Sequence, residues 1–179
     1  MFGAEPDKVV FTGPVAVGKT TAIACISDIP PISTDVDATD EIVLKKERTT
    51  VAMDYGFMMM DDGQYLHLYG TPGQERFNFM WDILVEGAMG LVVLIDASSE
   101  NPVRDLELYL DHFSGFIEKS ATVVGITRCD QVTRDVYLDL HHRLQQRQQK
   151  LPLFEIDARE PTDVKMLMYA LLAEVVYSH

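Results

Sequence analysis

A short segment near the amino terminus carries the residue types that bind a phosphate chain. It reads Gly13-Pro14-Val15-Ala16-Val17-Gly18-Lys19-Thr20. Gly13 and Gly18 have no Cβ, so the loop can take positive φ values and bring backbone N–H groups close to a phosphate. Lys19 is a point charge for the terminal phosphates, and the Thr20 hydroxyl is a ligand for the Mg²⁺ that neutralises a triphosphate. The segment predicts a phosphate-binding loop whose residues, with the following Thr21, contact a nucleotide.

The flanking residues place this loop between a strand and a helix. The apolar run Val9-Val10-Phe11 precedes it, and residues 21–26 follow with helical character. A phosphate-binding loop needs this junction, because the helix directs its unpaired amides and the positive end of its dipole at the anion. The alternative, a glycine-rich turn that binds nothing, rarely falls between a strand and a helix.

Length, composition and charge limit the class of protein. The 179 residues are 47% hydrophobic, which is enough for a substantial core, and we expect one domain over residues 1–179. The formal net charge of -13 argues against binding of nucleic acid or of an anionic membrane. No apolar segment is long enough to cross a bilayer. A phosphate ligand must therefore be held locally, by the loop itself.

The cysteines and the amino terminus bear on location. Cys25, expected in a helix, and Cys129, expected in a loop, are too few for a disulfide framework or a metal cluster. The start Met1-Phe2-Gly3 matches neither a basic signal sequence nor a myristoylation site. We therefore expect reduced cysteines and a cytoplasmic protein.

Apolar runs that alternate with helical stretches predict an α/β protein of the P-loop NTPase fold, with helices on both faces of the sheet. Six strands are expected, at Lys8–Phe11, Thr50–Met60, Gln64–Tyr69, Leu91–Asp96, Thr122–Thr127 and Leu153–Ile156. The turn Asp61-Asp62-Gly63 predicts a hairpin, so only the second and third strands are antiparallel and the sheet is otherwise parallel, with one antiparallel edge strand.

Helices are expected directly after the phosphate-binding loop and at Asn101–Lys119, Arg134–Gln149 and Thr162–Val176. Residues 30–48 contain no clear element. Their place between the first helix and the second strand favours a mobile functional loop over a disordered insertion.

A second motif follows the third expected strand and reads Gly70-Thr71-Pro72-Gly73-Gln74-Glu75-Arg76-Phe77. With the phosphate-binding loop, it resembles the Ras-like small GTPases, whose equivalent segment is Asp-x-x-Gly-Gln-Glu. The resemblance covers nearly the whole chain. The Thr-Pro-Gly-Gln sequence at residues 71–74 is similar to the corresponding sequence of the bacterial MglA-like group. It implies that the Gly73 amide senses the γ-phosphate and that Gln74 orients the attacking water, with Lys19 absorbing charge. The alternative is a surface turn followed by a helix.

The resemblance also implies a magnesium site. Its ligands are Thr20 and a threonine of the first switch, which Thr50 matches best and for which Thr49 is a rival. Where the family has an aspartate that supports Mg²⁺ through water, this chain has Gly70. That loss weakens Mg²⁺ binding unless a neighbouring carboxylate such as Asp54 compensates.

Base recognition is expected from two further segments. Thr127-Arg128-Cys129-Asp130 stands where the family has Asn-Lys-x-Asp, and Ala158 and Arg159 stand where it has Ala-Lys. The Asp130 carboxylate accepts hydrogen bonds from N1–H and the exocyclic amine of guanine, which adenine does not offer. The Arg128 guanidinium stacks on the purine. An ordinary polar loop after a buried strand is the alternative.

The resemblance implies a molecular switch that binds GTP or GDP with Mg²⁺ and hydrolyses GTP slowly. Arg48 and Arg76 are the candidates for an arginine that completes the site from within the chain. The implied partners are a roadblock-fold regulator and an effector that reads residues 30–50 and 71–86. Two alternatives stay open: a nucleotide-dependent scaffold with little turnover and an ATP-using phosphotransferase.

Overall fold

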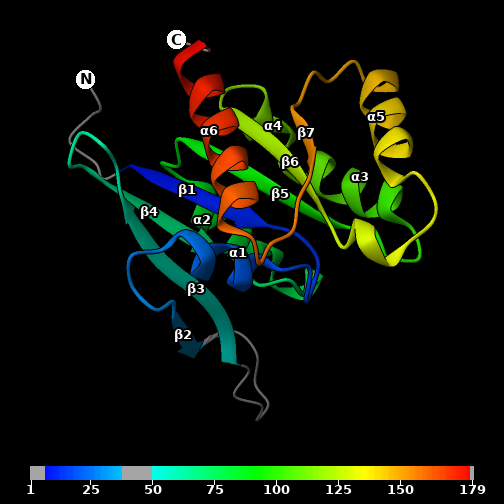
Figure 1. Ribbon diagram of the computed structural model, residues 1–179. Coiled ribbons are helices and arrows are strands. Elements are labelled where there is room, and N and C mark those ends of the chain that lie inside the picture. Colours follow the sequence, from blue (N-terminus) through cyan, green and yellow to red (C-terminus); the bar gives the residue numbers. More distant parts are fainter. Residues whose placement is uncertain (1–6, 38–49, 178–179) are drawn as a thin grey trace.

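The computed structural model describes residues 7–37 and 50–177 (Figure 1). Its strands form one sheet in the spatial order β2-β3-β4-β1-β5-β6-β7. Their bounds are β1 Lys8–Thr12, β2 Ile32–Asp37, β3 Thr50–Met59, β4 Tyr65–Gly70, β5 Gly90–Asp96, β6 Ala121–Thr127 and β7 Leu153–Glu155. The P-loop NTPase fold that the sequence predicts is confirmed, with every expected strand found to within one residue at either end.

The prediction of six strands was wrong, because β2 adds a seventh at the edge of the sheet. It lies inside residues 30–48, which we expected to contain no element, and the rest of that segment lies outside the described residues. Its β-branched residues Ile32, Thr34 and Val36 alternate with Ser33, Asp35 and Asp37. Aspartate is depleted in strands, so this strand depends on pairing with its neighbour rather than on local preference.

Two pairs of strands are antiparallel, not one. The hairpin at Asp61–Gly63 joins β3 and β4 as predicted, and β2 runs antiparallel to β3 along the edge. The pairs β1–β4, β1–β5, β5–β6 and β6–β7 are parallel. The carboxyl ends of β1, β4, β6 and β7 therefore meet at one edge of the sheet, and the four predicted motifs follow these ends.

The helices are α1 Lys19–Ile26, α2 Asn78–Val85, α3 Pro102–His112, α4 Ser114–Ile117, α5 Val136–Gln146 and α6 Pro161–Tyr177, with short 3-10 turns at Glu75–Phe77 and Cys129–Gln131. The sequence missed α2. It also predicted one helix over Asn101–Lys119, which the structure divides at Phe113. The Phe113 side chain is buried against Trp81, and Gly115, a poor helix former, follows it. Among the described residues, no helix has the length and apolar character needed to span a bilayer.

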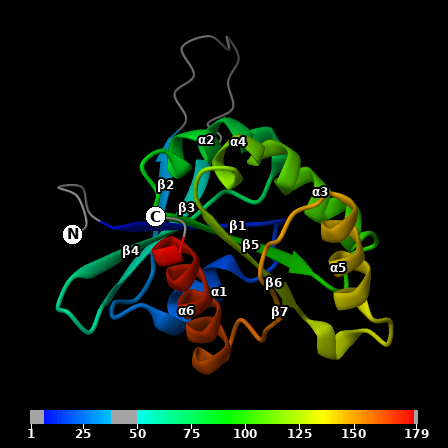
Figure 2. The ribbon, with the colours of Figure 1, turned by 90° about the horizontal axis from the view of Figure 1, so that it is seen from above.

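Two apolar cores sandwich the sheet, and the strands supply both by alternation. In β5, Val92 and Leu94 pack in the core under α1 and α6, whereas Leu91, Val93 and Ile95 pack in the core under α2, α3 and α5 (Figure 2). All five side chains are fully buried. A strand covered on both faces reads as a continuous apolar run, which is why the sequence located it well.

Candidate functional site

The phosphate-binding loop links β1 to α1, as predicted. Gly18 precedes the helix with φ 116°, a conformation that residues with a side chain rarely adopt. A Cβ at Gly18 would lie 3.0 Å from the Cβ of Ala158, so the loop packs closely on the segment after β7. Among the described side chains, none caps the first turn of α1. The unpaired amides of this turn remain available to an anion.

Lys19 is buried within the loop that it follows. Its Nζ donates hydrogen bonds of 2.7 Å to the carbonyl oxygens of Gly13 and Pro14. Burial lowers the pKa of Lys19 from 10.5 to about 8, and the nearby negative charge of Asp54 opposes that change. A buried ammonium that is bound only by neutral carbonyl oxygens becomes more stable when a phosphate oxygen replaces them. Opposite charges attract each other strongly where water is excluded.

Thr20, which follows Lys19 in α1, is in contact with Asp54. The Thr20 hydroxyl donates a 2.5 Å hydrogen bond to Oδ2 of Asp54, which lies on β3. A second donor, the Ser33 hydroxyl of β2, lies 2.9 Å from Oδ1. One threonine hydroxyl and one carboxylate therefore stand together at the start of α1. Both are oxygen ligands of the kind that Mg²⁺ prefers.

The segment after β4 lies directly against the phosphate-binding loop. A Cβ at Gly73 would lie 2.6 Å from the backbone nitrogen of Val15 and 3.0 Å from Nζ of Lys19, so only glycine fits there. The Thr71 and Thr12 hydroxyls, 2.9 Å apart, share a buried hydrogen bond. The buried indole of Trp81 donates a 2.7 Å hydrogen bond to the carbonyl oxygen of Pro72. These contacts hold Gly73 against the phosphate-binding loop, beside Val15 and Lys19.

Gln74 follows Gly73 and is held by a neighbour. Its Oε1 accepts a 2.7 Å hydrogen bond from Nε of Arg76, whose guanidinium stacks over the ring of Phe77. The carboxamide oxygen that would orient a water is therefore occupied in this structure. Arg76 therefore competes with a water for the same carboxamide oxygen, which can accept two hydrogen bonds.

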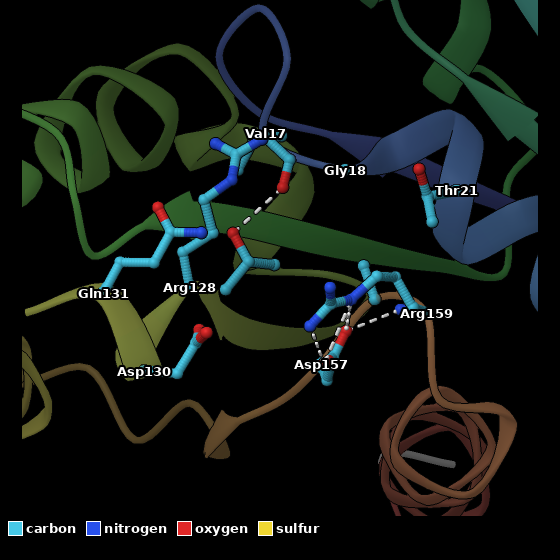
Figure 3. A pocket seen from close by; sticks show the side chains of 10 residues that line it. Val17, Gly18, Thr21, Arg128, Asp130, Gln131, Asp157 and Arg159 are labelled. Carbon is cyan, nitrogen blue, oxygen red and sulfur yellow. Dashed lines mark hydrogen bonds and ion pairs between the residues drawn. The ribbon is translucent and has the colours of Figure 1, made fainter.

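A pocket forms where the segments after β1, β6 and β7 meet, and it collects the residues predicted for base recognition (Figure 3). It is lined by Val17, Gly18, Thr21, Thr127, Arg128, Asp130, Gln131, Asp157, Ala158 and Arg159. The Thr127 hydroxyl donates a 2.9 Å hydrogen bond to the carbonyl oxygen of Val17. A threonine thus connects the base-recognition segment to the phosphate-binding loop.

Arg128 makes a second connection between the base-recognition segment and the phosphate-binding loop. It has a left-handed backbone, with φ 57°, and its guanidinium donates to the carbonyl oxygen of Ala16 and to the carboxylate of Asp96 at the end of β5. The side chain is thereby stretched across the loop. Asp96 was not among the predicted residues, and its only sequence signal is its place at the end of a buried strand.

Three charged residues stand around the mouth of this pocket. Asp130 is exposed, and among the described residues none donates a hydrogen bond to its carboxylate. Arg159 forms an ion pair with Asp157, at 2.6 Å between Nη2 and Oδ2. The hydrogen bonds from Arg159 lower the pKa of Asp157 to about 2. Asp157 therefore stays charged and holds Arg159 beside Ala158, while Asp130 remains open to a ligand.

Most of the predicted site residues are brought together at this edge of the sheet. Thr50 starts β3, but its side chain lies outside the described residues, as do Arg48 and Thr49. Asp157 lines the pocket, although it was not among the predicted site residues. Its position could have suggested a role, because Asp157 directly precedes Ala158 after a predicted strand. Among the described residues, no group of three or more His, Cys, Asp or Glu residues forms a metal site.

A family described as conserved hypothetical ATP binding protein matches residues 32–174. The matched region includes the Gly70–Phe77 motif and the base-recognition residues, whereas the phosphate-binding loop precedes it. An uncharacterized protein of Methanocaldococcus jannaschii is 34% identical over 101 residues, which is 56% of this chain and 58% of that protein. The chain thus spans a little over half the length of this archaeal relative.

Ras-related proteins are similar to the chain over more of its length. RabG2 of Dictyostelium discoideum is 24% identical over 98% of this chain and 86% of its own length. Rab-3 of Caenorhabditis elegans is 25% identical over 94% of this chain and 73% of its own length. SEC4 of Candida albicans is 24% identical over 73% of this chain and 64% of its own length. With the family match spanning well over half of its residues, the chain belongs to the family of conserved hypothetical ATP binding proteins.

Proposed function

We propose that the chain is a Ras-like GTP-binding switch, a single domain that binds guanine nucleotide with Mg²⁺ and hydrolyses GTP slowly. The observation that carries this proposal is that direct contacts join the phosphate-binding loop to the three other predicted motifs. Gly73 lies against Val15, Thr127 is hydrogen-bonded to Val17, and Gly18 packs on Ala158. A turn that binds nothing has no need of such contacts between segments far apart in the sequence.

The phosphate end of the site rests on Lys19, Thr20 and Gly73. The loop amides and the Lys19 ammonium hold the phosphate chain, and the Gly73 amide reports the presence of the γ-phosphate. Thr20, with Thr50 in the GTP state, is proposed to hold Mg²⁺, which would neutralise phosphate charge when bound. Of these two threonines only Thr20 has a described side chain, and the contact of its hydroxyl with a carboxylate fits a hard cation.

The chemical step assigned to Gln74 is the orientation of a water for in-line attack on the γ-phosphate. The Gln74 carboxamide oxygen accepts a hydrogen bond from Arg76, which competes with the water that it would orient. Turnover by the unaided protein is therefore expected to be slow. A regulator that draws Arg76 away would accelerate it.

Guanine is proposed as the base because of Asp130. Its open carboxylate at the pocket accepts two donors of guanine, whereas adenine has no N1–H to offer. The Ras-related relatives support the same choice, while the description of the matching family names ATP. The ATP-using alternative predicts that Asp130 contributes nothing to nucleotide preference.

A scaffold with little turnover is the second candidate. The contact between Arg76 and Gln74 favours it, because Arg76 competes with a water for the carboxamide oxygen. Both candidates share the nucleotide site and differ only in phosphate release.

Partner surfaces are proposed on the segments that would respond to the γ-phosphate. On α2, Phe79 and Ile83 are 48% and 59% exposed and lie four residues apart on one side of the helix. They offer an apolar strip next to Gly73 and Gln74, which suits an effector or the proposed roadblock-fold regulator. The location proposed for such a switch is the cytoplasm.

Mass spectrometry of nucleotide released from the purified protein, followed by a timed phosphate-release assay, tests the proposal. The expected result is guanine nucleotide with phosphate release well below one turnover per second. Guanine nucleotide without any release favours the scaffold, and adenine nucleotide refutes the assignment of Asp130. Lys19→Ala is the negative control for binding, and the exposed Lys165→Ala is its matched charge control on α6.

A further inference from the structure

The site contains a carboxylate on β3, beside the strand end at which Ras-like proteins carry theirs. Ras-like proteins have an aspartate where this chain has Gly70, at the end of β4. In the sheet, Gly70 is paired with Asp54 of the antiparallel strand β3. A Cβ at position 70 would lie 3.1 Å from the Cβ and 3.2 Å from Oδ2 of Asp54. The Asp54 side chain therefore fills the space in front of Gly70, and the missing side chain at position 70 makes room for it.

The Asp54 carboxylate is held in this place from two sides. Oδ2 accepts the 2.5 Å hydrogen bond from Thr20 and Oδ1 the 2.9 Å hydrogen bond from Ser33. These donors belong to α1 and β2, so three elements fix one carboxylate. Its charge also acts on Lys19, where it opposes the lowering of the ammonium pKa. Asp54 is thus close to both side chains of the phosphate-binding loop that would serve Mg²⁺ and phosphate.

The residues present fit a magnesium ion. Mg²⁺ takes oxygen ligands, keeps several of its waters and is commonly supported by one or two carboxylates beside substrate phosphates. Here a threonine hydroxyl and a carboxylate are already in contact. A carboxylate that accepts a hydrogen bond from a metal-bound group orients that group and strengthens metal binding.

We propose that Asp54 supplies, from β3, the acidic support for Mg²⁺ that position 70 lacks. This inference rests on the proposed nucleotide-binding function and names the residue that makes it dependent on Mg²⁺. Asp54 acts as a positioning residue through Thr20 and through metal-bound water. The arrangement also ties the metal to the edge of the sheet, because Ser33 of β2 holds the same carboxylate.

The test measures how strongly Mg²⁺ retains nucleotide. Fluorescent GDP is loaded onto the purified full chain, and its release is timed in excess Mg²⁺ and in EDTA. For the unaltered protein, we expect release to be much slower in Mg²⁺. Asp54→Asn, which keeps the shape of the side chain, should raise the release rate in Mg²⁺ by about 10- to 100-fold and leave the rate in EDTA nearly unchanged.

A compensating variant makes the test specific. In Asp54→Gly combined with Gly70→Asp, the carboxylate returns to β4 and both close contacts with the side chain of residue 54 are removed, which leaves the flexible end of Ile23 at 3.2 Å, so at least part of the Mg²⁺ effect should return. Asp139→Asn, an exposed aspartate of α5, is the matched control and should behave as the parent. Thermal unfolding of each variant separates loss of fold from loss of metal. Bound Mn²⁺, followed by electron paramagnetic resonance, gives a readout that needs no turnover.

Each outcome decides the matter. A Mg²⁺ effect that falls in Asp54→Asn and returns in the double variant supports the assignment. If Asp54→Asn keeps the parent's Mg²⁺ effect, Asp54 has no such role, while nucleotide binding by the parent would still support the proposed function. If the folded parent takes up no nucleotide at all, the proposed function and this inference both fail.

Discussion

The protonation of Lys19 offers a direct measure of how the phosphate-binding loop works. Burial lowers its pKa from 10.5 to about 8, a gap that corresponds to roughly 3 kcal/mol against the charged form. In the unfolded chain the ammonium is solvated, so the unfolded state binds more protons than the folded state between pH 8 and pH 10.5. The stability of the nucleotide-free protein should therefore rise with pH in this window. Below pH 8 the full free-energy cost of burying the charged Lys19 ammonium is present.

Nucleotide should reverse this effect, because a phosphate oxygen beside Nζ stabilises the ammonium. With a pKa of about 8, about a tenth of Lys19 is neutral at pH 7 and about three quarters at pH 8.5. Binding of GDP should therefore take up almost no proton at pH 7 and most of one proton at pH 8.5. The higher pH stays below the range in which the N1–H of guanine ionises appreciably.

Calorimetry in buffers with different ionisation enthalpies counts these protons. Lys19→Arg, whose charge does not titrate in this range, should take up none at pH 8.5 if it still binds. Lys165→Arg is the control and should match the parent. Uptake below about a quarter of a proton at pH 8.5, or equal uptake in the parent and Lys19→Arg, would refute the coupling between Lys19 and phosphate. By the same reasoning, Lys19→Met should lose nucleotide binding without destabilising the nucleotide-free protein. Methionine lacks the charge that binds phosphate, and it also removes the free-energy cost of burying that charge.

Three further predictions concern base choice, turnover and stability. Asp130→Asn should reduce the preference for guanine over adenine nucleotides by about 1.5–3 kcal/mol, measured by competition, and an unchanged preference would place base recognition elsewhere. Gln74→Leu should suppress phosphate release and spare GDP binding, whereas Arg76→Ala should accelerate release because it frees the Gln74 carboxamide; equal rates in both variants would contradict the assigned contact. Thr122→Val should stabilise the fold by about 1 kcal/mol in urea unfolding, because the buried Thr122 hydroxyl has no hydrogen-bond partner among the described residues. A lower midpoint would mean that the hydroxyl is satisfied.

Two features of the fold could not be predicted from the sequence. The break between α3 and α4 at Phe113 depends on burial of that ring against Trp81, which is distant in the chain. The edge strand β2 contains serine and aspartates, and only its ladder with β3 makes it a strand. In both cases, contacts with another element outweigh local preference.

The sequence by itself determined the elements whose cause is local. The phosphate-binding loop, the hairpin at Asp61–Gly63 and the buried run of β5 each follow from short-range rules of backbone freedom, turn chemistry and apolar patterning. The Gly70–Phe77 motif and the base-recognition segments were likewise located by residue type and order. These features could be located from the sequence, because a few adjacent residues suffice to specify them.

Only the tertiary structure decided which side chains meet. The contact of Asp54 with Thr20 and Gly70 depends on the register of β3 against β4, since a shift by one residue would turn Asp54 to the other face of the sheet. The ion pair of Arg128 with Asp96 and the hydrogen bond of Thr127 to Val17 likewise join residues 32 and 110 positions apart. Such pairs are fixed by how the strands are ordered and aligned, and no short stretch of the chain contains that information.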